Sequence, residues 1–316
     1  MHLRPVLLAL VAELATVLAS GRVAAQASEA PAGADAVELH RGERPRADEF
    51  ETARMVGTGL GLRAGAFGTT AVLVNPANLP LARSYHVEGF VQYIPVEGGV
   101  SFGSVIADSS TQRIRAGVAS RAIFGDGEHD YRGSDQRLAL GTALSDAIGL
   151  GVSLRYMRFR ARDQTSDGFP SSLELRRITL DAAVRVSPFE GLHIAALGYN
   201  LVRTKSVLAP TQIGGSVVYQ LRSVLQVGGD FLVDLTTFDH TTVLYGGAVE
   251  WWIAERYPLR AGYRRDEGRK IHALSFGVGF VEQRYGIELS LRQELGPYRQ
   301  SVILVSARYA LDVQQE

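Results

Sequence analysis

Apolar and polar residues alternate strictly near the C-terminal end of the chain. The run Tyr285–Arg292 reads YGIELSLR, so its Tyr, Ile and two Leu residues share one parity. Because successive side chains of a β-strand point to opposite faces, this run predicts a strand with one apolar and one polar face. The pattern recurs in about fourteen segments of about ten residues between positions 85 and 311. Lipid on one face and a polar lumen on the other is typical of a transmembrane β-barrel.

The parity of each predicted strand assigns its side chains to one of these two faces. The face expected to contact lipid includes Ile178, Leu180, Val184, Val186, Leu225, Val227, Phe231, Val243, Tyr245, Val249, Trp251, Leu274, Phe276, Val278, Phe280, Leu289, Ile303, Val305, Ala307 and Tyr309. The lumen candidates are Arg115, Arg121, Arg155, Arg177, Arg185, Glu250, Arg260 and Glu288. A basic strip for an anionic head group is one interpretation of these charges. The acidic residues among them favour the other, cross-strand ion pairs that fill a narrow interior.

The N-terminus carries the parts of a secretory signal peptide. Arg4 provides the basic start, an apolar run extends from Val6 to Leu18, and Val23-Ala24-Ala25 fits a small-residue cleavage site. A buried helix of a soluble protein is the alternative interpretation. A soluble β-sandwich would also show alternating strands, but its apolar faces would meet in a core. Export signal and strand number together favour a barrel in the outer membrane of a Gram-negative bacterium, reached after signal cleavage.

Composition divides the chain into five segments. We expect a signal peptide at 1–25, a flexible leader at 26–51, a small-residue-rich segment at 52–84, the barrel at 85–311 and a short tail at 312–316. The leader is rich in Ala, Glu, Arg and Pro, with too little apolar surface to bury.

Several function classes are excluded by composition and motifs. The 33 basic and 33 acidic residues balance, so no bulk charge indicates a nucleic-acid partner. The absence of Cys excludes disulfides, thiolate metal sites and a Cys nucleophile. Gly59 and Gly61 lack the Lys-Ser/Thr of a phosphate-binding loop, and no Ser pairs with a His and an acid. We expect no enzyme activity, no catalytic residues, no cofactor and no bound metal.

Predicted connections alternate between long and short. Outer-membrane barrels have long outer loops and short periplasmic turns, so we expect the short set to face the periplasm. The longer polar segments are 125–135, 161–172, 203–210 and 266–271, and the short ones are 146–148, 188–190 and 282–284. Asp126, Glu128, His129 and Asp130 lie close together in the first long loop. Their spacing matches no defined calcium loop, so a solvated loop is favoured over a calcium site.

Three motifs, in order, resemble the PorV/PorQ family of outer-membrane barrels, which are kin to the FadL long-chain fatty-acid transporters. The first is Ala53-Arg54 followed by Gly65-Ala66-Phe67-Gly68 and Asn75-Pro76-Ala77-Asn78-Leu79. The second is Gly198-Tyr199-Asn200-Leu201 followed by Ala209-Pro210-Thr211 and Ile213–Val217, and the third is Pro258–Tyr263. Thr69-Thr70-Ala71 departs from the family's Asp-Asp-Ala step, and the chain does not end on an aromatic residue.

The resemblance implies a barrel of fourteen strands with an N-terminal plug. Family members either move hydrophobic molecules or serve protein secretion as shuttles and scaffolds. We therefore expect a barrel that passes or binds small hydrophobic molecules. The alternatives are a non-transporting partner or scaffold for secretion or surface attachment, and a purely structural barrel. The implied partners are the lipid bilayer, hydrophobic small molecules or secreted proteins, and the barrel-assembly machinery, with no nucleic acid.

The plug is expected to fold back into the lumen ahead of the first strand. Its small residues allow close packing against the wall, and Pro76 stiffens its exit. The candidate plug or gate residues are Gly65, Gly68, Asn75, Pro76, Ala77 and Asn78. Whether this segment gates the lumen or only braces it is left open by the sequence.

Overall fold

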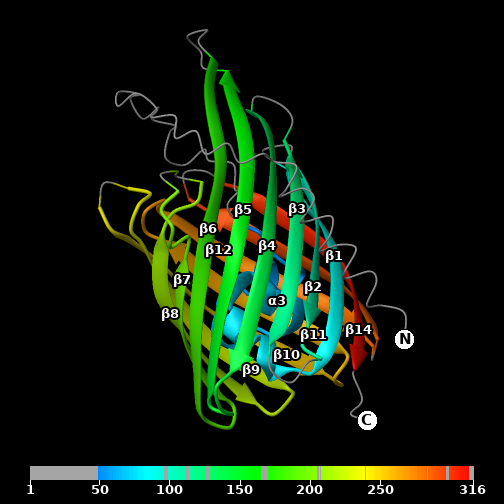
Figure 1. Cartoon of the computed structure of the whole chain (residues 1–316). Helices are drawn as coiled ribbons and strands as arrows, with labels where there is room; N and C mark the ends of the chain where they lie inside the picture. The colour runs from blue at the N-terminus through cyan, green and yellow to red at the C-terminus, as the bar shows by residue number, and fades with distance from the viewer. Residues whose placement is uncertain are drawn as a thin grey trace, which may run out of the picture. The chain divides into compact units, whose positions relative to one another are not determined.

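Fourteen antiparallel strands form a closed barrel in the computed structural model (Figure 1). The structure describes residues 49–312 apart from 96–98, 111–113, 126–128, 165–169, 205, 207, 239, 283 and 297–298. The predicted signal peptide, the leader up to residue 48 and the tail after residue 312 lie outside the described residues, as do Asp126 and Glu128 of the acidic cluster.

Each strand pairs with its neighbours in the chain, and β1 closes the barrel by pairing with β14. The strands are β1 Ser84–Ile94, β2 Gly99–Asp108, β3 Arg115–Phe124, β4 His129–Ala143, β5 Ile148–Gln164, β6 Pro170–Phe189, β7 Leu192–Tyr199, β8 Gln212–Leu221, β9 Leu225–Asp234, β10 Thr242–Ile253, β11 Tyr257–Asp266, β12 Ile271–Val281, β13 Tyr285–Leu295 and β14 Ser301–Asp312. The closing register places Ser84 opposite Asp312, so the barrel begins and ends at the same rim. An even number of strands requires this arrangement.

Three strands extend well past the rest at the opposite rim. β4, β5 and β6 contain 15, 17 and 20 residues, whereas β7 contains 8. Figure 1 shows these three strands rising above the others. The predicted long loops 125–135 and 161–172 are therefore wrong in part, because 129–135, 161–164 and 170–172 are strand. In this part of β5 and β6 the inward Met157, Phe159 and Leu175 are buried in a cluster and the outward side chains are arginines, so the pattern of apolar outside and polar inside is lost there.

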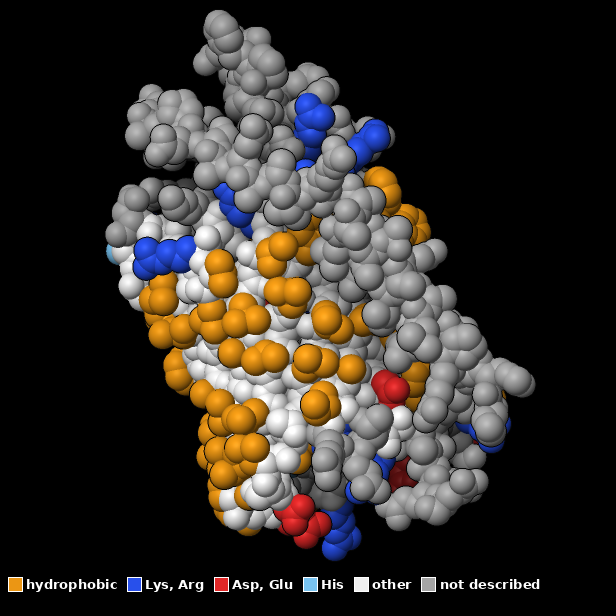
Figure 2. Space-filling view, in the orientation of Figure 1, with side chains coloured by type: hydrophobic (Ala, Val, Ile, Leu, Met, Phe, Trp, Pro, Cys, Tyr) orange, Lys and Arg blue, Asp and Glu red, His pale blue; other side chains and the backbone are white. Residues whose placement is uncertain are grey.

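The outer wall is apolar, and the parity predicted from the sequence holds. On β13, Ile287 and Leu289 are 62% and 47% exposed, while Glu288 and Ser290 are 2% and 1% exposed. Figure 2 shows a band of apolar side chains across the visible face of the wall, with charged side chains above and below it. The predicted all-β fold, a transmembrane antiparallel barrel with a short N-terminal plug, is confirmed.

The plug consists of four short helical pieces within the barrel. They are α2 Ala53–Gly57, the 3₁₀ turn η1 Arg63–Gly65, α3 Gly68–Val74 and the 3₁₀ turn η2 Pro76–Leu81. The Thr52 hydroxyl caps α2 by accepting from the backbone N–H of Met55. Asn75 has a non-helical backbone that ends α3, as expected for a residue before Pro, and Pro76 begins η2. No helix among the described residues is long and apolar enough to cross a membrane.

Residues 49–51, the end of the predicted leader, lie with the plug. Phe50 and Glu51 are fully buried, and the Phe50 ring packs 5.6 Å from the Phe90 ring on β1. The packed part of the chain thus begins before Thr52.

Candidate functional site

A chain of buried charges ties α2 to the barrel wall. Arg54 Nε lies 2.9 Å from Glu250 Oε2, and Arg54 Nη2 donates to the Gln226 side chain at 2.7 Å. The same Glu250 oxygen accepts from Arg260 at 2.6 Å, and Arg260 also lies 2.8 Å from Glu288. Three of the predicted lumen residues thus form the cross-strand ion pairs expected of a narrow interior, and the plug adds a fourth member. Removing one member of such a buried set leaves a charge without compensation.

A second anchor holds the segment before α2. Arg292 Nη2 lies 2.8 Å from Glu49, and Arg292 also pairs with Glu51. Arg264 lies 2.8 Å from Glu49, and Gln92 donates to Glu51 at 3.3 Å. Burial raises the pKa of the Glu51 carboxyl, while the Arg292 guanidinium acts in the opposite direction. The two acidic residues therefore fix the chain to strands on opposite sides of the barrel seam between β1 and β14.

The Asn-Pro-Ala-Asn motif clamps the turn η1. Asn78 Nδ2 donates to the carbonyl oxygens of Ala64 and Ala66, each at 2.9 Å, and lies 3.2 Å from that of Arg63. Asn75 Nδ2 also donates to the Arg63 carbonyl at 3.2 Å. These two side chains therefore bridge η2 and η1. Both side chains are buried, and backbone groups that would otherwise lack partners are satisfied.

The wall holds the other side of η1. Ser216 accepts from the backbone N–H of Ala64 at 2.7 Å, and Asp230 accepts from that of Arg63 at 3.4 Å. Gly65 packs so closely that an added Cβ would lie 2.7 Å from Val218 Cγ1. Pro76 and Ala77 approach the backbone of β5 at Gly151, where a side chain would collide with both. Gly68 has a φ of 57°, a conformation that favours glycine.

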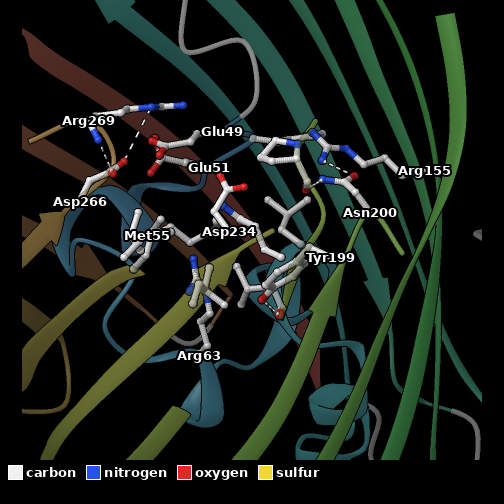
Figure 3. A pocket seen from close by; sticks show the side chains of 18 of the residues that line it. Glu49, Glu51, Met55, Arg63, Arg155, Tyr199, Asn200, Asp234, Asp266 and Arg269 are labelled. Atoms are coloured by element: carbon white, nitrogen blue, oxygen red, sulfur yellow. Dashed lines mark hydrogen bonds and ion pairs between the residues drawn. The ribbon is translucent and has the colours of Figure 1, made fainter. Parts of the chain in front are cut away.

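A cavity of about 100 Å³ lies in the lumen above η1, on the side of the longer strands. Its apolar lining includes Met55, Leu60, Leu73, Val74 and Leu232. Its charged lining is Glu49, Glu51, Arg63, Arg137, Arg155, Asp234, Asp266 and Arg269. Figure 3 shows Arg63 and Tyr199 rising into it, with Glu49, Glu51 and Asp234 on one side and Arg155 and Asn200 on the other.

Most polar groups of this cavity already have partners. Arg155 lies 2.5 Å from Asp135, and its Nη1 donates to Asn200 at 3.3 Å. Tyr199 donates to the Val74 carbonyl at 2.5 Å. The Arg63 guanidinium lies over the Tyr199 ring at 5.5 Å, and its Nε is 3.8 Å from an Asp230 oxygen. A ligand would therefore meet apolar side chains beside charged groups that are mostly paired, and Nε and Nη1 of the Arg63 guanidinium make no hydrogen bond.

A second, larger cavity of about 1080 Å³ opens at the other rim. It is lined by the short turns after β4, β6 and β8, and by Gly65 and Phe67 of the plug. Arg63 lines the upper cavity and Gly65 the lower one, so η1 is the partition between them.

The remaining predicted lumen residues lie in three environments. Arg121 is buried, lies 5.2 Å from the Phe50 ring and donates to the Glu49 carbonyl. Arg185 is buried beside the lower cavity, where it donates to Ser187 at 2.5 Å, and Arg115 is buried near the same rim. Arg177 is exposed, because β6 extends past the lumen at that level.

Sequence reasoning missed several residues of the upper cavity. Arg63 belongs to a segment with no strand periodicity, Asp135 was assigned to a loop, and Glu49 and Glu51 were assigned to the leader. Arg137 could have been found, because it shares the inward parity of β4. It lies 3.5 Å from Asp135 and 3.9 Å from Asp181.

Comparison with solved structures shows which known barrels this fold is similar to. No family model and no curated protein matches the sequence. The toluene transporter TbuX of Ralstonia pickettii has a similar structure, with 12% identity, a TM-score of 0.61, and 84% of this chain and 99% of that chain covered. A Pseudomonas aeruginosa FadL homologue gives 10% identity, a TM-score of 0.60 and coverage of 83% and 98%. The P. putida toluene transporter TodX has 10% identity and a TM-score of 0.55, with 85% of this chain and 100% of that chain covered. At these identities the likeness shows that this chain has the fold of the FadL-like barrels.

Proposed function

We propose that this protein is an outer-membrane barrel that binds small hydrophobic molecules in its upper cavity and passes them toward the periplasm. The observation that carries the proposal is the pair of cavities on the two sides of η1, the upper one with an apolar part formed by Met55, Leu60, Leu73, Val74 and Leu232. The shared fold of toluene transporters supports the same function. The apolar outer band supports the membrane location.

The size of the upper cavity limits the ligand. An apolar protein cavity of about 150 Å³ binds benzene. The upper cavity has a volume of about 100 Å³, so it would have to expand slightly to hold a compound of that size. A long acyl chain would require the plug or the outer loops to move. We therefore favour monocyclic hydrocarbons over long-chain lipids as the class of compound.

A fluorinated aromatic tests the proposal directly. Fluorobenzene binding to the purified barrel in detergent can be followed by fluorine NMR. We expect saturable binding that is lost in Leu232→Trp, because the indole fills the cavity from β9. Phe231→Trp is the matched control, since the neighbouring side chain faces lipid. Absence of saturable binding, or equal binding by both variants, refutes the cavity as the site.

The second candidate is a partner or scaffold barrel for secretion or surface attachment. The resemblance to PorV/PorQ and the extension of the β5–β6 hairpin past the rim favour it. Because the chain has no Cys, Arg177→Cys would introduce a unique cross-linking site on this hairpin. Specific protein adducts in cells that disappear when residues 161–172 are removed, with hydrocarbon binding unchanged, would support this candidate over transport.

A further inference from the structure

The outward face of β4, β5 and β6 carries arginines just beyond the apolar band. Arg158 and Arg160 on β5, Arg176 on β6 and Arg132 on β4 are all exposed. They have the same parity as Leu154 and Ile178, which face outward in the band. Figure 2 shows basic side chains over the upper part of this wall, above the apolar side chains. These four residues, the arginine patch, thus lie on the lipid-facing side of the barrel and not in its lumen.

The strand register sets like charges directly against each other in this patch. Arg158 is opposite Arg176, and Arg160 is opposite Arg132. Directly opposite positions bring side chains within about 5 Å at Cβ, where like charges destabilise a sheet. Among the outward side chains that the structure describes at this level, the charged ones are all arginines.

Local contacts orient part of the patch toward the outside. Arg176 Nε donates to the Tyr156 hydroxyl at 3.2 Å, which holds the guanidinium against the wall and leaves its Nη groups for another acceptor. Tyr156 lies between Leu154 of the apolar band and Arg158 along the outward face of β5. An aromatic residue at this position is typical of the interface between the hydrocarbon and the head groups.

We propose that the arginine patch binds the phosphate groups of an outer-leaflet lipid. Its position beyond the apolar band, on the rim opposite the chain ends of the barrel, is the level of the outer head groups. Guanidinium groups match phosphate oxygens with paired hydrogen bonds, and a dianionic phosphate between Arg158 and Arg176 offsets their repulsion. The lipid's acyl chains would lie along Leu154 and Ile178 of the same strands. This inference rests on the proposed membrane location but not on the proposed cargo.

Lipid binding to the purified barrel tests this assignment. The probes are bis-phosphorylated lipid A and the same lipid without phosphates, measured by native mass spectrometry from detergent. We expect the wild type to prefer the phosphorylated form. The variant Arg158→Gln/Arg160→Gln/Arg176→Gln should bind it about 100-fold more weakly, since each arginine at an anionic lipid surface contributes about fivefold.

The controls separate phosphate recognition from general charge and from misfolding. Arg222→Gln/Arg256→Gln removes two exposed arginines at the other rim and should leave binding unchanged. Arg158→Lys/Arg176→Lys keeps the charge but loses the paired donors of the guanidinium, so it should bind the phosphorylated lipid more weakly than the wild type and more tightly than the triple Gln variant. Unchanged binding in a folded triple Gln variant, equal binding of the dephosphorylated lipid, or an equal loss in the control variant would overturn the proposal. Fluorobenzene binding should be the same in all of these variants. A wrong assignment of the ligand cavity can therefore be distinguished from a wrong assignment of the arginine patch.

Discussion

Replacing Asn78 with Ala should open the partition between the two cavities. The Asn78 amide is within 3.2 Å of three carbonyl oxygens of the segment from Arg63 to Ala66, and its two protons can serve two of them. Each buried polar group left without a partner costs about 1–3 kcal/mol, so the docking of η1 should weaken by about 2–6 kcal/mol. At the lower limit of about 2 kcal/mol, the state with η1 displaced would be populated about 30-fold more often than in the wild type.

Single-channel conductance in planar bilayers reports whether the partition at η1 opens. The temperature of thermal unfolding reports how far the plug stabilises the barrel. We expect more frequent or larger open events for Asn78→Ala than for the wild type. Asn75→Ala is the graded control, because Asn75 donates one hydrogen bond, to the Arg63 carbonyl, and its effect should be smaller. Unchanged conductance with a lower unfolding temperature would show that the plug only braces the barrel. No change in either measurement would refute the clamp itself.

Three other predictions test the wall, the anchor and the location. Leu289→Arg on the lipid face should destabilise the barrel by about 2–4 kcal/mol in urea unfolding from vesicles, whereas Tyr285→Arg near the strand end should cost about 0–1 kcal/mol; equal losses would contradict the depth assignment. Glu250→Gln should cost about 3–5 kcal/mol, because Arg54 and Arg260 lose their shared buried carboxylate; a loss under 1 kcal/mol would mean that the anchor is compensated elsewhere. The exported protein should remain with outer membranes after carbonate washing, and recovery in the soluble periplasmic fraction would disprove the membrane location.

The strands and their faces could be predicted from the sequence because a two-residue period is a local property. Alternation along 285–292 alone assigns Leu289 outward and Glu288 inward, and the structure agrees. The alternation of apolar and polar residues is absent where the outer face of a strand is not apolar. Positions 129–135 are strand at the end of β4 above the apolar band, where the outward Arg132 is exposed and the inward Asp135 is buried in an ion pair, so the sequence resembles a loop.

The candidate site depended on tertiary structure, because its partners are far apart in the chain. Arg292 pairs with Glu51 across 241 positions, and Arg54 with Glu250 across 196. No local pattern encodes such pairs; they follow from the closing register of the barrel and from the path of the plug inside it. Sequence alone therefore determined the inward or outward parity of strand positions within the apolar band, as for Glu288 and Leu289. Only the closed barrel decided which inward side chains meet, and that η1 divides the lumen into two cavities.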